Sequence, residues 1–407
     1  MARSGVRGPW PGGMNNLANW RALPAGTVRD SINVDPHEDG IMSLRAGYQR
    51  VYSGSDVRGA LAIGEYVLIA DGDQLRVFDV RTNATQTLRT IAPAGRFVGT
   101  VWNDELFFCT ENETLRFRGG VLRSWGVTTV SSQPVPSVGP GSLTAGYYWS
   151  ACTLVDAAGD EGGTTSPVLI ALEANSSLVV QLPNPPAGGK VRFYVGSQDG
   201  ETLYLQYESE LGGEYVCSTV RDDGPRLVTQ FTRAPVVADK VAYHNGVLLM
   251  VEGKTLWMTE PLRPHLRNAS KRFFQYSSNI DMVISSEEDG GLFLSAGEAT
   301  YFLTDIESSE PKQKQVAPYG AVGGTEVATP DNKVAWMTQY GLAKSTGQGK
   351  VGLLSAANFV PELAQAGGSG IVENNGSQLV VTTLSGIRAE NNLAARDYYE
   401  AEIIYND

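Results

Sequence analysis

The sequence predicts an all-β protein: a β-propeller of six blades with an immunoglobulin- or fibronectin-like β-sandwich inserted into it. Three observations favour this class. The chain has 46 glycines, 20 prolines and 17 tyrosines among 407 residues, a composition typical of turn-rich β-proteins. Pairs of apolar runs joined by a short polar turn recur about every 40 to 45 residues, which is the spacing of propeller blades. One interval is longer by about 100 residues, the size of a small sandwich domain.

Six candidate blades are marked by the turn between their first two apolar runs. The copies at residues 62–78 and 101–117 are the most alike, and the last two are the weakest. Because a single blade cannot bury both of its faces, the blades must pack around a central axis. Helices are expected to be scarce, with residues 356–365 as the best candidate. The turns begin at Gly64, Asn103, Asn245, Asp289, Asp331 and Asn374.

The long interval has the features of an inserted domain. It opens with a linker rich in Pro, Ser and Gly at 131–141, and apolar runs follow at 147–155, 178–182 and 191–195. Short strands at this spacing predict a sandwich between the second and third blades. We therefore divide the chain into an N-terminal arm and hairpin at 1–50, first blades at 51–128, the insert at 129–225 and further blades at 226–407.

The N-terminal 50 residues do not match the repeat. Residues 31–48 read as two short strands joined at Asp39-Gly40, a strong hairpin signal. One interpretation is that this first strand completes a blade together with residues 397–405, which would remove an exposed sheet edge. The alternative is a hairpin packed on the outside of the propeller.

Charge and cysteine content exclude several classes. The net charge of -12 argues against general affinity for nucleic acid or anionic membranes, since both require basic surface. The N-terminus lacks the apolar run of a secretory signal, and no run is long enough for a membrane-spanning helix. Three widely spaced cysteines cannot form a disulfide framework, and we interpret them as small apolar side chains in the core: Cys109, Cys152 and Cys217.

No motif in the sequence carries recognisable catalysis, so we predict no enzyme, cofactor or metal. None of the three histidines, His37, His244 and His265, adjoins a nucleophile motif or has zinc-ligand spacing. The glycine-rich segments 187–191 and 347–351 are incomplete as phosphate loops and read as turns. A solvated turn is favoured over a calcium site for the acidic cluster of Asp156, Asp160 and Glu161.

Three separated patches carry a resemblance to a known family. The first is the N-terminal series, and the others are residues 143–159 and 256–265. Together they resemble the tail nozzle, or tail tubular B-type, proteins of short-tailed bacteriophages, in which a β-propeller carries inserted domains. The N-terminal series reads Gly13-Met14-Asn15-Asn16, Leu23-Pro24-Ala25-Gly26, Asn33-Val34-Asp35, Asp39-Gly40 and Arg45-Ala46-Gly47-Tyr48.

The resemblance implies a structural role in a virion tail, in a chain made in the host cytoplasm. It implies a ring of copies, six-fold in this family, below the portal and head-to-tail adaptor. Such a ring carries tail fibres or a needle-like plug, and DNA passes through it without specific binding. The acidic balance would let DNA pass without pausing. The alternative is a carbohydrate-binding or carbohydrate-active propeller, whose acid pair would leave no local signature.

Five residues of the N-terminal part are candidate assembly contacts. Two are tryptophans in a Gly/Pro-rich arm, where a large apolar side chain can anchor to a neighbouring subunit or the adaptor, or pack within its own domain. The others could fix the hairpin. The five are Trp10, Trp20, Arg29, Arg45 and Tyr48.

Overall fold

The structure is a computed structural model that describes residues 9–29, 31, 34–36, 40–44, 50–93, 95–130, 132–355, 357–361, 363–374 and 377–385. Within these ranges the only helix is the three-residue 3-10 helix η1 (Trp20–Ala22). No described helix has the length and apolar character needed to span a membrane. The chain forms two compact units, Met1–Gly54 with Tyr276–Asp407, and Ser55–Gln275.

The expectation of a helix at 356–365 is wrong for the residues described there. Residues 357–361 and 363–365 form turns and irregular structure. The physical reason is Pro361, which lacks the backbone N–H that a helix needs and clashes with the preceding turn.

In the unit Ser55–Gln275, the first two blades are four-stranded antiparallel sheets whose strands follow one another in sequence order. Asn103 and Asp104 both adopt positive φ in the turn between β9 and β10, the geometry of a tight two-residue hairpin. The first blade contains β5 (Val57–Ile63), β6 (Tyr66–Asp71), β7 (Gln74–Asp79) and β8 (Ala84–Thr90). The second contains β9 (Val98–Trp102), β10 (Glu105–Cys109), β11 (Thr114–Arg118) and β12 (Val121–Ser124).

The third blade of this unit has two additional strands. β24 and β25 both pair with β23, and β20 pairs with the outer side of β24. Asn245 and Gly246 make its first turn, again with positive φ. Its strands are β20 (Thr232–Arg233), β21 (Lys240–His244), β22 (Val247–Glu252), β23 (Thr255–Glu260), β24 (Arg263–Asn268) and β25 (Phe273–Gln275).

Strand β10 shows how these blades pack. Its residues 106–109 are all apolar and fully buried. Because side chains alternate along a strand, Leu106 and Phe108 join the core shared with the first blade, whereas Phe107 and Cys109 join the core shared with the third. Both faces of β10 are therefore buried, and this explains why its apolar run is uninterrupted.

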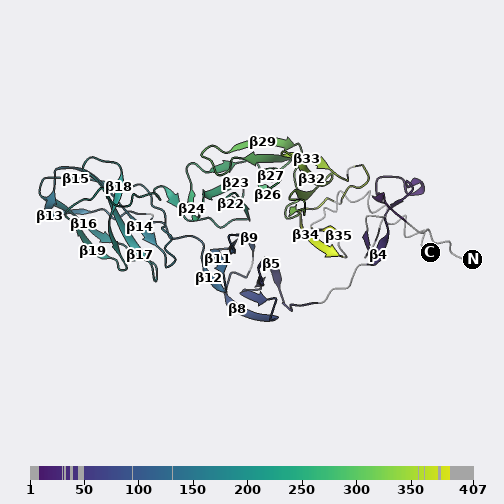
Figure 1. The fold of residues 1–407 in the computed structure, drawn as a ribbon, viewed down its shortest axis with the longest axis horizontal. Coiled ribbons are helices and arrows are strands. Elements are labelled where there is room, and N and C mark those ends of the chain that lie inside the picture. Colours follow the sequence, from purple (N-terminus) through teal and green to yellow (C-terminus); the bar gives the residue numbers. More distant parts are fainter. Residues whose placement is uncertain are drawn as a thin grey trace, which may run out of the picture. The chain divides into compact units, whose positions relative to one another are not determined.

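The insert lies between β12 and β20 and is a seven-stranded sandwich. One sheet has the order β13-β16-β19 and the other β15-β14-β17-β18; Figure 1 shows the seven strands gathered in one group. The strands are β13 (Ser137–Leu143), β14 (Gly146–Val155), β15 (Val168–Leu172), β16 (Ser176–Leu182), β17 (Lys190–Gly196), β18 (Leu203–Ser209) and β19 (Gly213–Cys217).

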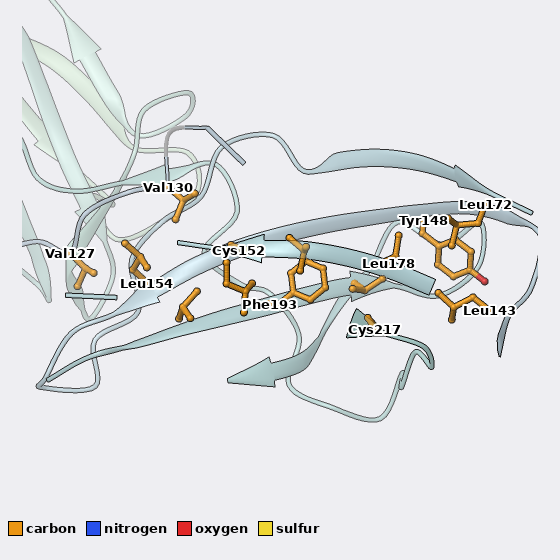
Figure 2. Close-up of a cluster of buried hydrophobic side chains, with 14 residues drawn as sticks. Val127, Val130, Leu143, Tyr148, Cys152, Leu154, Leu172, Leu178, Phe193 and Cys217 are labelled. Carbon is orange, nitrogen blue, oxygen red and sulfur yellow. The ribbon is translucent and has the colours of Figure 1, made fainter. Parts of the chain in front are cut away.

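The sandwich core lies between its two sheets. Figure 2 shows Cys152 and Phe193 near its middle, with Tyr148 and Leu172 at one end. Alternate residues of β14 point inward, namely Tyr148, Cys152 and Leu154, and each is at most 8% exposed. This two-residue alternation, visible in the sequence, explains why the segment forms one face of a sandwich.

The other unit contains two further four-stranded blades. Phe293 of β27 and Trp336 of β31, with ring centroids 5.4 Å apart, lie in the core that the two blades share. One blade contains β26 (Ile280–Ser286), β27 (Gly291–Ala296), β28 (Ala299–Thr304) and β29 (Lys312–Ala317). The other contains β30 (Val327–Ala328), β31 (Val334–Thr338), β32 (Gly341–Gly347) and β33 (Lys350–Leu353).

Three two-stranded pairs complete this unit. The hairpin of β3 (Val34–Pro36) and β4 (Met42–Leu44) is antiparallel, with Val34 opposite Leu44. β34 (Ala366–Asn374) and β35 (Ser377–Ser385) form the sixth repeated hairpin, and β1 (Gly13–Met14) pairs in parallel with β2 (Thr27–Val28). Residues 397–405, proposed to complete a blade, lie outside the described residues.

The predicted fold class is confirmed: the protein is all-β, built from propeller blades, with an inserted β-sandwich. Outside the sandwich, the five sheets of four or more strands and the β34–β35 hairpin correspond to the six repeats found in the sequence.

Candidate functional site

The N-terminal arm, residues 9–29, is tied to a segment near the other end of the chain. Nδ2 of Asn16 donates to the carbonyl of Val360 at 2.8 Å, and Oδ1 of Asn16 accepts from the Val360 amide at 3.1 Å. The Asn16 amide also donates to the carbonyl of Asn358 at 3.0 Å. These bonds join residues more than 340 positions apart in sequence, so the arm is an integral part of its unit.

The neighbouring residues shape the arm for this contact. Asn15 is 4% exposed, its amide donates to the carbonyl of Val28 at 2.7 Å, and its Oδ1 accepts from the Ala18 amide at 2.9 Å. Gly13, with φ of 64°, occupies the left-handed region that glycine adopts without strain. The Gly-x-Asn-Asn motif therefore has a local structural purpose.

Two of the five candidate assembly residues are described with their side chains. Trp10 is half-buried, and its amide donates to the carbonyl of Gly40 at 2.7 Å. Arg29 is also half-buried, and its Nη1 donates to the carbonyl of Ala18 at 3.1 Å. The side chain of Trp20, and all of Arg45 and Tyr48, lie outside the described residues. The assembly role of all five stays a prediction.

A cluster of charges joins the second blade to the inserted sandwich. Arg116 of β11 is 6% exposed. Its Nη2 lies 3.0 Å from Oδ2 of Asp156, and its Nη1 lies 2.8 Å from Oδ2 of Asp160. Nε of Arg116 is 3.7 Å from Oε1 of Glu105 in the same blade, and Nδ1 of His265 in β24 is 3.5 Å from Asp160. We call these five residues the junction cluster.

The junction cluster fixes the loop that follows β14. Oδ1 of Asp156 accepts the amides of Ala158 and Asp160, both at 2.9 Å, so its other oxygen is free to face Arg116. A second contact joins the second blade to the third beside this cluster, because Nε1 of the fully buried Trp125 donates to the carbonyl of Pro264 in β24 at 2.8 Å. Sandwich and blades thus meet through specific polar contacts.

The acidic cluster weighed as a calcium site is neutralised by the protein itself. Asp156 and Asp160 face Arg116, whereas Glu161 turns to the other side and accepts from Thr153, Arg192 and Tyr194 at 2.5 to 2.7 Å. The solvated-turn interpretation needs correction too, because these carboxylates are ion-paired and half-buried. Across the described ranges, no group of three or more His, Cys, Asp or Glu residues could hold a metal ion.

His265 is held in its neutral form. Burial lowers its pKa below 6.5, and Arg116 adds to this, while Asp160 and Asp156 act in the opposite direction. The imidazole therefore contributes a neutral packing group rather than a cation to the junction cluster.

The remaining histidine and cysteine predictions have simple outcomes. His244 is 4% exposed and ends β21 at the hairpin turn, consistent with the interpretation as a core or turn histidine, and His37 lies outside the described residues. All three cysteines are buried, as expected for apolar side chains of the core. Burial raises their pKa values to about 11 for Cys109, about 12 for Cys152 and about 11 for Cys217.

Sequence reasoning missed Arg116. The sequence does hold a sign that Arg116 is buried, because it stands between Leu115 and Phe117 in an apolar strand, and both of these neighbours are buried. A cation in such a strand needs an anionic partner. The identity of that partner, 40 residues away, has no local signature.

Comparisons with known proteins identify no family. No family model matches the chain, and no curated protein matches it. Solved structures with a similar fold include the N-terminal domain of Nup159, at 13% identity and a TM-score of 0.31, with 81% of this chain and 73% of that chain covered. Another is apo AztD from Citrobacter koseri, at 11% identity and a TM-score of 0.26, with 73% and 84% covered. We draw nothing about function from these likenesses.

Proposed function

We propose that this chain is a structural, non-enzymatic component of a bacteriophage tail, of the nozzle or tail tubular B type. In this role it assembles with copies of itself, as a hexamer, into a ring in the virion tail. The ring continues the DNA channel below the portal and adaptor and supports the attachment of fibres or a plug.

The proposal depends mainly on one observation: residues in the three patches that resemble nozzle proteins make structural contacts within the chain. Asp156 belongs to the patch at 143–159 and His265 to the patch at 256–265. Arg116 pairs directly with Asp156, and Asp160 connects Arg116 to His265. In the N-terminal patch, Asn15 and Asn16 bind backbone groups. The patches thus hold elements of the chain in place, which is the role expected of architectural residues in an assembling protein.

The packing within each unit also supports the proposal. Consecutive blades share cores built from large side chains, such as Phe107 with Trp125 and Phe293 with Trp336. Blocks of this kind suit a closed ring, because identical rigid surfaces repeat the same heterologous contact until the rotation closes.

The experiment is a mass measurement by light scattering on the purified protein, alone and mixed with its candidate adaptor, followed by negative-stain imaging of large species. We expect rings with an open centre. A protein that stays monomeric in both conditions would contradict the proposal. A glycan array and a glycosidase assay would then test the carbohydrate alternative.

A further inference from the structure

The third blade carries an unusual concentration of positive charge. Residues 232–275 contain seven Lys or Arg and three Asp or Glu, although the whole chain has a net charge of -12. Four of the seven cations are exposed, and Arg267 is half-buried. Charge is therefore segregated, with an excess of cations on this blade and an excess of carboxylates over the rest of the chain.

Two of these cations lie side by side. Arg233 of β20 and Arg267 of β24 are directly opposite in the antiparallel ladder, a position in which like charges destabilise a sheet. Across the residues that the structure describes, no carboxylate oxygen lies within 4.0 Å of a nitrogen of either guanidinium. Among the described residues the pair therefore has no direct ion-pair partner, although Glu252 is close enough to act on Arg267.

The guanidinium of Arg267 is positioned by its surroundings. It lies 4.5 Å from the ring centroid of Trp257, and its Nε donates to the carbonyl of Ala234 at 3.0 Å. Its Nη1 is buried and has no hydrogen-bond partner. Burial lowers the pKa of Arg267, the nearby Arg233 lowers it further, and Glu252 acts in the opposite direction. Because its Nε is bonded and its Nη1 is buried, Arg267 contributes mainly charge beside the exposed Arg233.

Two exposed aromatic side chains belong to the same part of the chain as the arginine pair. Phe273 of β25 is 38% exposed, with its ring centroid 5.3 Å from that of Trp257. Phe231, next to β20, is 50% exposed and has φ of 61°. Positive φ is a strained conformation for a bulky residue, and strain of this kind gathers at functional positions. Arginine and aromatic residues together are the composition of interface hot spots.

We propose that Arg233, Arg267, Trp257, Phe273 and Phe231, which we call the arginine patch, bind exposed carboxylates of a second copy of this chain. This inference rests on the proposed function, for which it supplies one side of the contact between neighbouring subunits. The occupant follows from charge complementarity, because a second copy offers an acidic surface to a basic patch. Arg233 is exposed and can take a carboxylate in a bidentate bond, while Arg267 adds positive charge beside it and the aromatic rings exclude water.

The test compares Arg233→Glu with wild type by light scattering over a range of protein concentrations, with and without adaptor. Arg233 is exposed, so we expect the variant to fold, with an unchanged circular dichroism spectrum. Its melting temperature should be no lower than that of wild type, because the change replaces a like-charge pair opposite Arg267 with an opposite-charge pair. Self-association should weaken by about 30-fold or more, as for loss of a desolvated charge pair. The matched control is Lys254→Glu, which makes the same change of charge at an exposed turn of the same blade and should associate as wild type does.

The other possible results of this experiment refute the arginine patch, the proposed function or both. Rings formed equally well by wild type and Arg233→Glu would refute the arginine patch and leave the proposed function standing. A wild type that stays monomeric with and without adaptor would refute both. Equal weakening by Lys254→Glu would show an effect of total charge and refute the patch. Unchanged self-association with loss of binding to a 30-base-pair DNA duplex at low salt would make the patch a nucleic-acid site.

Discussion

Arg116 should be the most costly single residue to remove from the junction between blade and sandwich. In Arg116→Met, the side-chain length is kept, but Asp156 and Asp160 lose the cation that lies 3.0 and 2.8 Å from them. Removing one partner of a buried ion pair costs about 3 to 5 kcal/mol, because the remaining charge is left without compensation. The two carboxylate side chains keep 23% and 27% exposure, which favours the lower end, about 3 kcal/mol.

The assay is guanidinium unfolding followed by tryptophan fluorescence. Trp125 bonds to Pro264, the residue before His265 of the junction cluster, and so reports on this region; its share of the signal is identified in a Trp125→Phe variant. Arg118→Met is the matched control, since Arg118 ends the same strand but is exposed, and it should change the free energy of unfolding by less than about 0.5 kcal/mol.

A combined variant separates the lost interaction from the charges left behind. If uncompensated charge is the cause, adding Asp156→Asn and Asp160→Asn to Arg116→Met should recover at least half of the loss. The reasoning is refuted if Arg116→Met costs no more than Arg118→Met, or if the combined variant is the less stable of the two.

Three further outcomes are expected. Because the folded pKa of His265 lies below its unfolded value of 6.5, wild type should lose stability as the pH falls from 6.5 through the folded pKa. His265→Gln should lack this part of the loss, as measured by denaturation at pH 7.5 and pH 5. Asn16→Ala removes two hydrogen bonds to Val360, and hydrogen exchange at the Val360 amide should accelerate about ten-fold. No thiol should react with iodoacetamide at pH 8 before unfolding, whereas all three should react afterwards: Cys109, Cys152 and Cys217.

Each of these has a result that would count against it. A stability difference between wild type and His265→Gln that does not vary with pH would exclude the histidine as its source. The Phe193 amide in the sandwich is the internal control for Asn16→Ala, and equal acceleration at both amides would indicate global destabilisation. Rapid labelling of any thiol in the native protein would show that its burial is not maintained in solution.

Much of the fold was predictable because its signals are local. The turns at Asn103 and Asn245 use residue types that tolerate positive φ, so their positions follow from short-range sterics. The alternation of Tyr148, Cys152 and Leu154 in β14 follows from the two-residue period of a strand. The absence of a helix in the described residues of 356–365 also has a local cause, because Pro361 interrupts the segment.

The candidate site was much less predictable. The sequence marks Asp156 and Asp160 only as acidic residues in a turn, and no sequence pattern identified Arg116 as their partner. Their pairing depends on the insert folding back onto the second blade. Similarly, Arg233 and Arg267 are 34 residues apart, and only the ladder between β20 and β24 places them opposite each other.

The all-β class, the repeating hairpins and the inserted sandwich can therefore be read from the amino-acid order alone, because these depend on strand periodicity, turn chemistry and spacing along the chain. Which charges meet, as in the junction cluster, and which distant segments are joined, as Asn16 is to Val360, became clear only from the folded protein. The physical reason is that an ion pair or hydrogen bond depends on separation in space, and long-range packing sets that separation without leaving a pattern between the residues involved.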